Sequence, residues 1–293
     1  MMNLTDMKTV RSILGKHGFH FSKKLGQNFL IDPSVCPRIA EEGNAASGYG
    51  VLEIGPGIGT LTQQLALRAE KVTSVELDQR LLPILEETVG EFDNLHVLHG
   101  DILQFDVPQL LEQEFPGLRV AVCANLPYYI TTPILMHLLE SGAPIDSITV
   151  MVQKEVAEKL QAPVGTRNSG AITAAVNYYG TVEMLFTVPR DSFLPPPNVD
   201  SAVIRIDVQK RYADLIHDPE HFFAMLKHGF SQRRKTLVNS LSATMHYEKA
   251  FLLETLRGLE LPETVRMENL TMEQLAALSN CLSVKNSTRT EKV

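Results

Sequence analysis

The sequence lacks the features that mark membrane-spanning, secreted or disulfide-rich proteins. Among its 293 residues, no apolar run approaches the roughly 20 residues that cross a bilayer, and residues 1–16 alternate polar and apolar side chains. We therefore expect neither a membrane span nor a secretory signal. Cysteine is scarce: Cys36, Cys123 and Cys281 lie far apart, without CxxC spacing. A disulfide framework or a zinc site is not expected, and the reducing cytoplasm is the simplest setting.

Internal repeats and sustained heptads are also absent from the sequence, so a monomer is the default expectation. The composition, with 44% hydrophobic and 21% charged residues, is typical of a soluble globular protein. The net charge of −7 argues weakly against binding nucleic acid. However, residues 1–28 hold five basic side chains against one acidic, and residues 227–235 hold four basic and none acidic. Each basic segment is a candidate RNA-binding patch, with an ordinary solvated face as the alternative.

Short apolar runs alternate with helical patterns over the first half of the chain, which predicts a doubly wound, mostly parallel α/β sheet. The expected strands are residues 49–54, 71–77, 95–98, 119–124 and 147–152, and the expected helices are 60–71, 79–89 and 132–140. Two further strand-like runs, 181–188 and 201–208, have no helix between them, which predicts antiparallel closure of one sheet edge.

From about residue 217 the pattern is helical only. The expected helices are residues 220–230, 234–241, 247–259 and 271–282. We therefore predict an α/β domain over residues 1–209, a small all-helical domain over 210–284, and a disordered polar tail over 285–293.

A glycine-rich segment, Glu53–Gly59 (EIGPGIG), lies between the first expected strand and the first expected helix. Gly55 and Gly57 would permit a tight turn and a close approach of a cofactor to the backbone. The dinucleotide fingerprint GxGxxG would need glycine where Thr60 stands, which argues against a nicotinamide oxidoreductase. A glycine turn without a ligand is the alternative.

Two acidic residues follow the next two strands of the predicted sheet. Glu76 lies near the offset at which a carboxylate accepts from ribose hydroxyls, and Asp101 could accept from an adenine amino group. Because ligands of such sheets sit at the carboxyl ends of the strands, these residues and the glycine turn predict a nucleoside cofactor. Asp101 could instead only cap the turn that follows it.

The fourth strand ends in Asn125-Leu126-Pro127-Tyr128, the most specific motif of the chain. The lone pair of an exocyclic adenine nitrogen is delocalised into the ring, so attack on a methyl group requires that nitrogen to become tetrahedral. The Asn125 side-chain oxygen and the Leu126 carbonyl could accept its hydrogens and favour this change. Pro127 would fix the turn, and Tyr128 could stack on the base. The alternative is a tight turn without chemistry.

Four ordered motifs resemble the bacterial small-subunit (16S) rRNA adenine N6,N6-dimethyltransferases of the KsgA/RsmA type. They are Lys24–Leu30 (KLGQNFL), EIGPGIG, Asn125–Pro133 (NLPYYITTP) and Phe193–Ala202 (FLPPPNVDSA). The resemblance runs from about Phe19 to the C-terminal helices. It implies a class I, Rossmann-like methyltransferase sheet with a helical RNA-recognition domain, and S-adenosylmethionine as cofactor. It also implies dimethylation of two adjacent adenosines in the 3′-terminal hairpin loop of 16S rRNA, and a role in biogenesis of the 30S subunit.

The resemblance also assigns residues by motif position. The implied cofactor contacts, together with Gly57 of the glycine turn, are Asn28, Leu30, Gly55, Glu76, Asp101 and Asn125. Tyr128 and Phe193 are the implied base-stacking pair beside Asn125 and Leu126. The expected phosphate contacts lie in the basic segments, at Lys23, Lys24, Arg233, Arg234 and Lys235. Asn198 and the segment 168–171 depart from the usual pattern of the relatives.

The sequence is also compatible with other interpretations. The segment GQNFL could be a hydrophobic anchor for the sheet instead of a lid, and FLPPP a plain connector instead of a support that projects Phe193. Macrolide-resistance methyltransferases, which act on large-subunit rRNA, share the NLPY-like motif. An RNA-binding assembly factor without catalysis is a third possibility. No metal site is expected, because His96 and His99 lack a third ligand.

Overall fold

The structure is a computed structural model that describes residues 2–209 and 211–290. The chain divides into two compact units. The first comprises Met1–Ala157 and Val182–Val208, and the second comprises Glu158–Thr181 and Gln209–Val293. Residues 158–181 thus belong with the C-terminal helices, although the sequence predicted a single boundary after residue 209.

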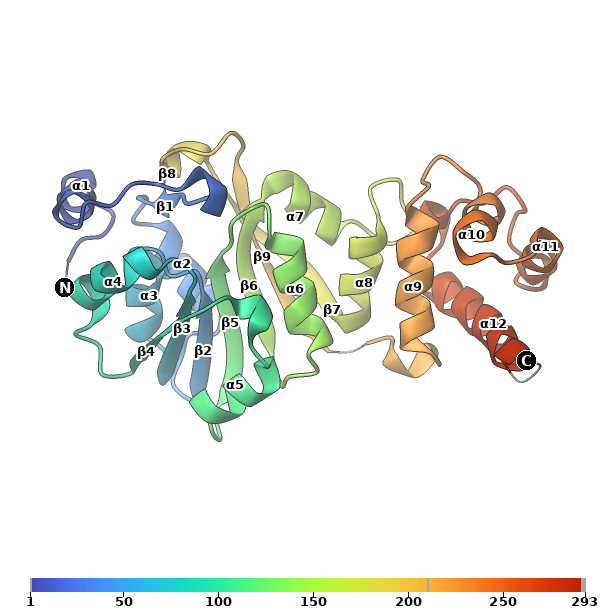
Figure 1. Ribbon diagram of the computed structural model, residues 1–293, viewed down its shortest axis with the longest axis horizontal. Helices are drawn as coiled ribbons and strands as arrows, with labels where there is room; N and C mark the ends of the chain where they lie inside the picture. Colours follow the sequence, from blue (N-terminus) through green and yellow to red (C-terminus); the bar gives the residue numbers. More distant parts are fainter. Residues whose placement is uncertain (1, 210, 291–293) are drawn as a thin grey trace. The chain divides into compact units, whose positions relative to one another are not determined.

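The first unit is built on a seven-stranded sheet with the order β4-β3-β2-β5-β6-β9-β7 (Figure 1). Its strands are β2 (Tyr49–Ile54), β3 (Lys71–Glu76), β4 (Leu95–His99), β5 (Arg119–Asn125), β6 (Ser147–Gln153), β7 (Gly180–Val188) and β9 (Ser201–Val208). Strands β2 to β6 pair in parallel, while β9 pairs antiparallel with β6. The predicted antiparallel closure is therefore confirmed for β9. Strand order reverses between β2 and β5, and ligands of such sheets bind at this switch point.

The central strands β2, β3, β5 and β6 are buried along almost their whole length, because helices cover both faces of the sheet. The helices of this unit are α2 (Val35–Glu42), α3 (Thr60–Ala66), α4 (Leu82–Val89), α5 (Val107–Glu114) and α6 (Thr131–Glu140), and α7 (Lys154–Gln161) leads into the second unit. Short 3₁₀ turns lie at η2 (Gln79–Leu81), η3 (Ile102–Gln104) and η4 (Arg190–Ser192).

The N-terminal segment folds onto the same unit. Helix α1 (Met7–Lys16) begins after Asp6, whose side chain accepts from the Thr9 amide, and buries Val10, Ile13 and Leu14. The chain continues through η1 (Lys23–Leu25) into β1 (Phe29–Leu30), which pairs antiparallel with β8 (Phe193–Leu194). Residues far apart in the sequence thus form a small second sheet (Figure 1).

The second unit is helical. It contains α8 (Ala171–Tyr179), α9 (Pro219–Phe230), α10 (Leu237–Met245), α11 (Lys249–Gly258) and α12 (Met272–Thr290), with 3₁₀ turns η5 (Ala213–Leu215) and η6 (Met267–Asn269). Tyr178 and Tyr179 of α8 pack their rings against Phe223 of α9, which explains why residues 158–181 join this unit. The backbone is helical through Thr290, where the sequence predicted disorder from 285, and residues 291–293 lie outside the described part. No described helix is long and apolar enough to span a membrane.

Candidate functional site

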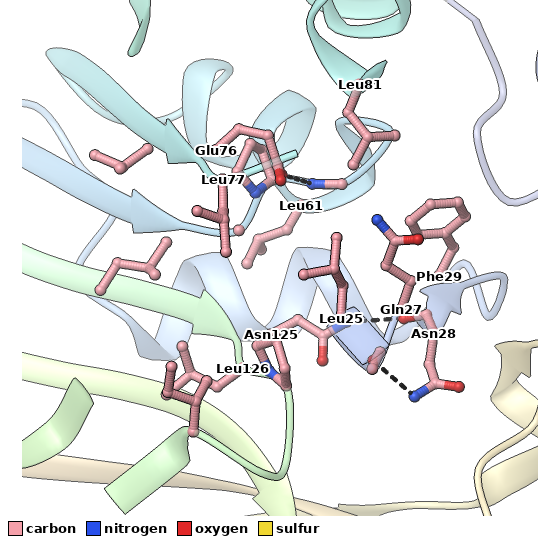
Figure 2. Close-up of a pocket in the computed structure, with 18 of the residues that line it drawn as sticks. Leu25, Gln27, Asn28, Phe29, Leu61, Glu76, Leu77, Leu81, Asn125 and Leu126 are labelled. Carbon is pink, nitrogen blue, oxygen red and sulfur yellow. Dashed lines mark hydrogen bonds between the residues drawn. The ribbon is translucent and has the colours of Figure 1, made fainter. Parts of the chain in front are cut away.

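A pocket lies at the switch point of the sheet, where the carboxyl ends of β2, β3, β4 and β5 meet the segment 25–30 (Figure 2). Its wall contains every cofactor-binding or catalytic residue that the sequence predicted in this unit, namely Asn28, Leu30, Gly55, Gly57, Glu76, Asp101, Asn125, Leu126, Tyr128 and Phe193. The six separate segments therefore form one site.

The glycine turn after β2 gives the pocket its floor. Gly57 adopts a φ of 62°, which favours glycine, and a Cβ there would stand 3.2 Å from the Phe29 ring. Gly59 has a φ of 90°, and a Cβ would meet Val89 at 2.7 Å. Both glycines are therefore required for the turn to pack between α4 and β1.

Glu76, at the end of β3, holds this turn in place. Its Oε2 accepts from the Gly57 amide at 3.2 Å, a bond drawn in Figure 2, and its Oε1 accepts from the Asp78 amide at 2.8 Å. The side chain is only 6% exposed, and burial raises the pKa of Glu76 to about 6 although these two amides lower it. The pocket wall therefore carries a fixed carboxylate acceptor.

A second buried carboxylate lies behind the wall. Glu53, the first residue of EIGPGIG, is 1% exposed, and its Oε2 accepts from the hydroxyls of Thr62 and Ser74 at 2.7 and 2.6 Å. Burial raises the pKa of Glu53 to about 7, against the lowering effect of these hydroxyls. Glu53 thus supports the strand end from inside the core.

Asp101 follows β4 and serves the capping role that was considered as an alternative. Its Oδ1 accepts from the Leu103 amide at 3.0 Å at the start of η3. Because the residue also lines the pocket, its side chain can both cap the turn and face a ligand. Capping therefore leaves the expected cofactor role open.

The motif Asn125–Tyr128 forms the opposite wall. The Asn125 Nδ2 donates to the backbone oxygen of Asn28 at 3.3 Å, and the Asn28 Nδ2 donates to the Gly26 carbonyl at 3.1 Å; Figure 2 shows these bonds. Within the turn, the Pro127 carbonyl accepts from the Ile130 amide and the Thr131 hydroxyl. The bond between Asn125 and Asn28 joins the two motifs, which are 97 residues apart in the sequence.

Two aromatic side chains complete this wall. Tyr128 is half-buried, and its hydroxyl lies 2.6 Å from the Ser201 Oγ; burial raises the pKa of Tyr128 above its usual value. Phe193 is 2% exposed and stands opposite Leu30 in the β1–β8 pair. The sequence suggested that FLPPP projects Phe193. The β1–β8 pairing holds the residue in the core, and its side chain also lines the pocket.

Comparisons with known proteins agree with this geometry. The family model described as "Ribosomal RNA adenine dimethylase" matches residues 18–283. The chain belongs to the ribosomal RNA adenine dimethylase family. It is 44% identical to "Ribosomal RNA small subunit methyltransferase A" of Alkaliphilus oremlandii over 97% of this chain and 100% of that protein, and 46% identical to the protein of the same name from Geobacillus sp., over 93% and 95%.

Two solved structures are similar as well. A dimethyladenosine transferase from Plasmodium falciparum has a TM-score of 0.74 at 26% identity and covers 88% of this chain and 98% of its own. The 23S rRNA methyltransferase ErmE has a TM-score of 0.64 at 28% identity, with 87% and 99% covered. The predicted Rossmann-like methyltransferase fold is confirmed, and the chain is an rRNA adenine dimethylase.

The dimethylase pocket also contains residues that the sequence did not suggest. The Thr60 hydroxyl, in a residue 7% exposed, has no hydrogen-bond partner among the described residues. Tyr129 and Leu77 line the wall and are 58% and 46% exposed. Gln27 lines it too, and its Nε2 donates to the Asp78 Oδ2 at 2.7 Å. Gln27 and Tyr129 carried a signal that could have been followed, because they lie within the motifs KLGQNFL and NLPYYITTP.

The expected RNA-binding residues of the dimethylase lie in different settings. Lys24 is exposed in the first unit, and the side chain of Lys23 lies outside the described part. In the second unit, Arg234 and Lys235 are exposed. Arg233 is exposed as well, but it also pairs with Glu268 at 2.8 Å and donates to the carbonyls of residues 167 and 169. Its guanidinium is therefore engaged within the unit, while 46% of the side chain remains exposed and its expected phosphate contact stays a prediction.

Proposed function

We propose that this dimethylase transfers methyl groups from S-adenosylmethionine to N6 of two adjacent adenosines in the 3′-terminal hairpin loop of 16S rRNA. The observation that carries the proposal is the single pocket in which the glycine turn, Glu76, Asp101 and the NLPY turn meet. The small-subunit specificity follows the names of the relatives, which are small-subunit rRNA methyltransferases. A role in the cytoplasm during biogenesis of the 30S subunit fits that substrate.

The residues of the pocket fit a sulfonium nucleoside. The unpartnered Thr60 hydroxyl offers a hydrogen bond to a polar ligand group, and nothing lies within 4 Å of the place where a Cβ would stand at Gly55. Glu76 would accept from ribose hydroxyls, and Asp101 from the adenine amino group. When bound, S-adenosylmethionine supplies an electrophilic methyl group. The cofactor contacts proposed from the motifs are Asn28, Leu30, Gly55, Gly57, Glu76, Asp101 and Asn125.

The chain's own contribution at the target nitrogen is to accept hydrogen bonds. The Asn125 amide uses its Nδ2 for Asn28, which orients Oδ1 as an acceptor for an N6 hydrogen. The Leu126 carbonyl would accept the second hydrogen. Together these acceptors favour the tetrahedral nitrogen that attacks, and the methylated nitrogen then loses its proton to water. Catalysis therefore needs placement and fixed dipoles instead of a strong base.

The base itself would be held by the aromatic residues. Tyr128 is anchored through Ser201, so its ring offers a fixed face, and Phe193 borders the same pocket. Extruding an adenine from a hairpin loop costs less than from a duplex, because loop bases are partly unstacked. Lys24, Arg234 and Lys235 are exposed cations available to RNA phosphates, and Lys23 and Arg233 belong to the same basic segments.

The test is methyl transfer from labelled S-adenosylmethionine to 30S and 50S subunits from cells that lack these modifications, with the position mapped. We expect two methyl groups on each of two adjacent adenosines of the 16S hairpin. Label in the large subunit alone would instead support the activity of a 23S rRNA methyltransferase such as ErmE, whose fold is similar. RNA binding without transfer would favour an assembly factor without catalysis.

A further inference from the structure

Two neighbouring tyrosines follow the NLP turn, and the structure places them differently. Tyr128 is half-buried and bonded to Ser201, whereas Tyr129 is 58% exposed at the mouth of the same pocket. No hydrogen bond holds the Tyr129 hydroxyl within residues 2–209 and 211–290. The Tyr129 ring is therefore available to a ligand at the mouth of the pocket.

The inner side of the Tyr129 ring rests on the segment 25–28. A Cβ at Gly26 would stand 3.4 Å from the Tyr129 Cδ1 and 3.5 Å from its Cε1, in ordinary contact. Gly26 has a φ of 60°, so the chain turns tightly beneath the ring. One side of the ring is therefore supported, and the rest faces solvent beside the opening through which a base must enter.

The surroundings of the ring suit single-stranded RNA. Lys24, which is exposed, lies two residues before Gly26 and directly precedes the segment 25–28 that supports the ring. Proteins bind unpaired nucleic acid by combining cations along the backbone with aromatic faces on which bases stack. When the target nucleotide is inserted into the pocket, the base of the neighbouring nucleotide stays next to the pocket mouth. That base has lost its stacking partner, because the target base has left the stack.

We propose that Tyr129 is a third substrate-binding aromatic, on which the base next to the target adenosine stacks at the mouth of the pocket. This inference rests on the proposed function, in which the target and its neighbour are adjacent adenosines of one loop. Tyr129 would thus position the neighbouring nucleotide during transfer, while Tyr128 and Phe193 contact the target base.

The rival role for Tyr129 is a latch that only holds the segment 25–28 over the cofactor. Three substitutions separate the roles. Tyr129→Phe keeps the ring, Tyr129→Leu keeps an apolar contact with Gly26 but lacks an aromatic face, and Tyr129→Ala lacks both. Leu67→Ala is the matched control, because Leu67 is 53% exposed at the end of α3, outside the pocket wall.

The experiment measures methyl transfer to 30S subunits reconstituted with 16S rRNA whose hairpin is a ligated synthetic segment, intact or abasic at one of the two adenosines. On intact subunits we expect Tyr129→Leu and Tyr129→Ala to raise KM for the subunits about tenfold. The kcat and the affinity for S-adenosylmethionine should stay close to wild type, and Tyr129→Phe and Leu67→Ala should behave as wild type.

The abasic subunits identify the stacked base. Loss of the neighbouring base should raise KM for the wild-type enzyme by a similar factor but add little in Tyr129→Leu. An unchanged KM in Tyr129→Leu, or a loss confined to cofactor affinity, would overturn the inference and leave Tyr129 as a latch. If the wild-type enzyme transfers no methyl group to intact subunits, the proposed function fails first, and this inference fails with it.

Discussion

Asn125 at the end of β5 donates its Nδ2 hydrogen to the backbone oxygen of Asn28, across 97 residues of sequence. The bond joins the segment proposed to cover the cofactor to the turn proposed to hold the target base. It also determines which end of the amide faces the pocket, because the nitrogen is used and the oxygen remains as the acceptor. Cofactor binding and base placement are therefore expected to be coupled through this pair.

Substitution of Asn125 should separate these two effects. Asn125→Ala removes both the acceptor and the tether, so we expect kcat to fall about 10²- to 10³-fold, as for loss of one preorganised polar group. Asn125→Asp keeps an acceptor but cannot donate to Asn28, so it should weaken S-adenosylmethionine binding while keeping more of the kcat than alanine does. Steady-state kinetics and calorimetric titration measure both. Full activity of Asn125→Ala would exclude the proposed role.

Phe193 requires a substitution that preserves its burial. Because Phe193 is 2% exposed opposite Leu30, Phe193→Ala should lower the free energy of unfolding by about 3–5 kcal/mol and disturb β1 as well. Phe193→Leu retains most of the packing but has no aromatic face. We expect it to impair RNA methylation more than cofactor binding, with a thermal midpoint near that of wild type. Methylation at the wild-type level by Phe193→Leu would show that the residue only packs.

The sheet was predictable because its central strands are buried on both faces. Such strands appear in the sequence as short, continuous apolar runs. The predicted and observed bounds agree for β2 and β9 and differ by about a residue elsewhere. The helix predicted over 60–71 ends at Ala66, because the Asn94 side chain donates to the carbonyls of Ala66 and Ala69. A contact from a distant loop is invisible to local periodicity.

Helix α8 shows a second limit of sequence patterns. Its residues Ala171–Tyr179 include β-branched and aromatic side chains, which carry a weak helical signal. Packing of Tyr178 and Tyr179 on Phe223 supplies the stabilisation that the local sequence lacks. Tertiary contacts of this kind determine both the helix and the unit to which it belongs.

The pocket was more predictable than its surroundings. Glycines, carboxylates and the NLPY turn must occupy the ends of parallel strands, so their spacing alone brings them together. The hydrogen-bond and ion-pair partners of a side chain do not follow from the spacing of motifs in the sequence. The sequence could not show that Arg233 is engaged by Glu268, or that Thr60 is buried without a partner among the described residues.

In the basic segment of the second unit, we therefore expect Arg233 to contribute mainly to stability and Lys235 mainly to RNA binding. Arg233→Ala should lower the thermal midpoint of the protein by a few degrees, because the ion pair with Glu268 and the bonds to residues 167 and 169 are lost. Lys235→Gln should leave the midpoint unchanged and reduce the slope of log affinity for 30S subunits against log salt by about one. Calorimetry and binding titrations over a salt series test both. A lower salt slope for Arg233→Ala at unchanged stability would contradict this division.

The buried carboxylate of Glu53 should make stability depend on pH. Its pKa is about 7 in the folded protein and near 4.5 when exposed, so between these values the folded state holds a proton that the unfolded state has lost. The free energy of unfolding should then fall as pH rises from 4.5 to 7, by up to about 3 kcal/mol.

Glu53→Gln removes this titration and keeps a side chain of similar shape that the hydroxyls of Thr62 and Ser74 can bond. The variant should therefore lose less stability than wild type between pH 5 and pH 8. A smaller fall should remain, because burial raises the pKa of Glu76 to about 6 and its titration acts in the same direction. Denaturant unfolding at a series of pH values measures the difference. Parallel curves for the two proteins would mean that Glu53 stays ionised in the folded state, held by its two hydroxyl donors against the cost of burial.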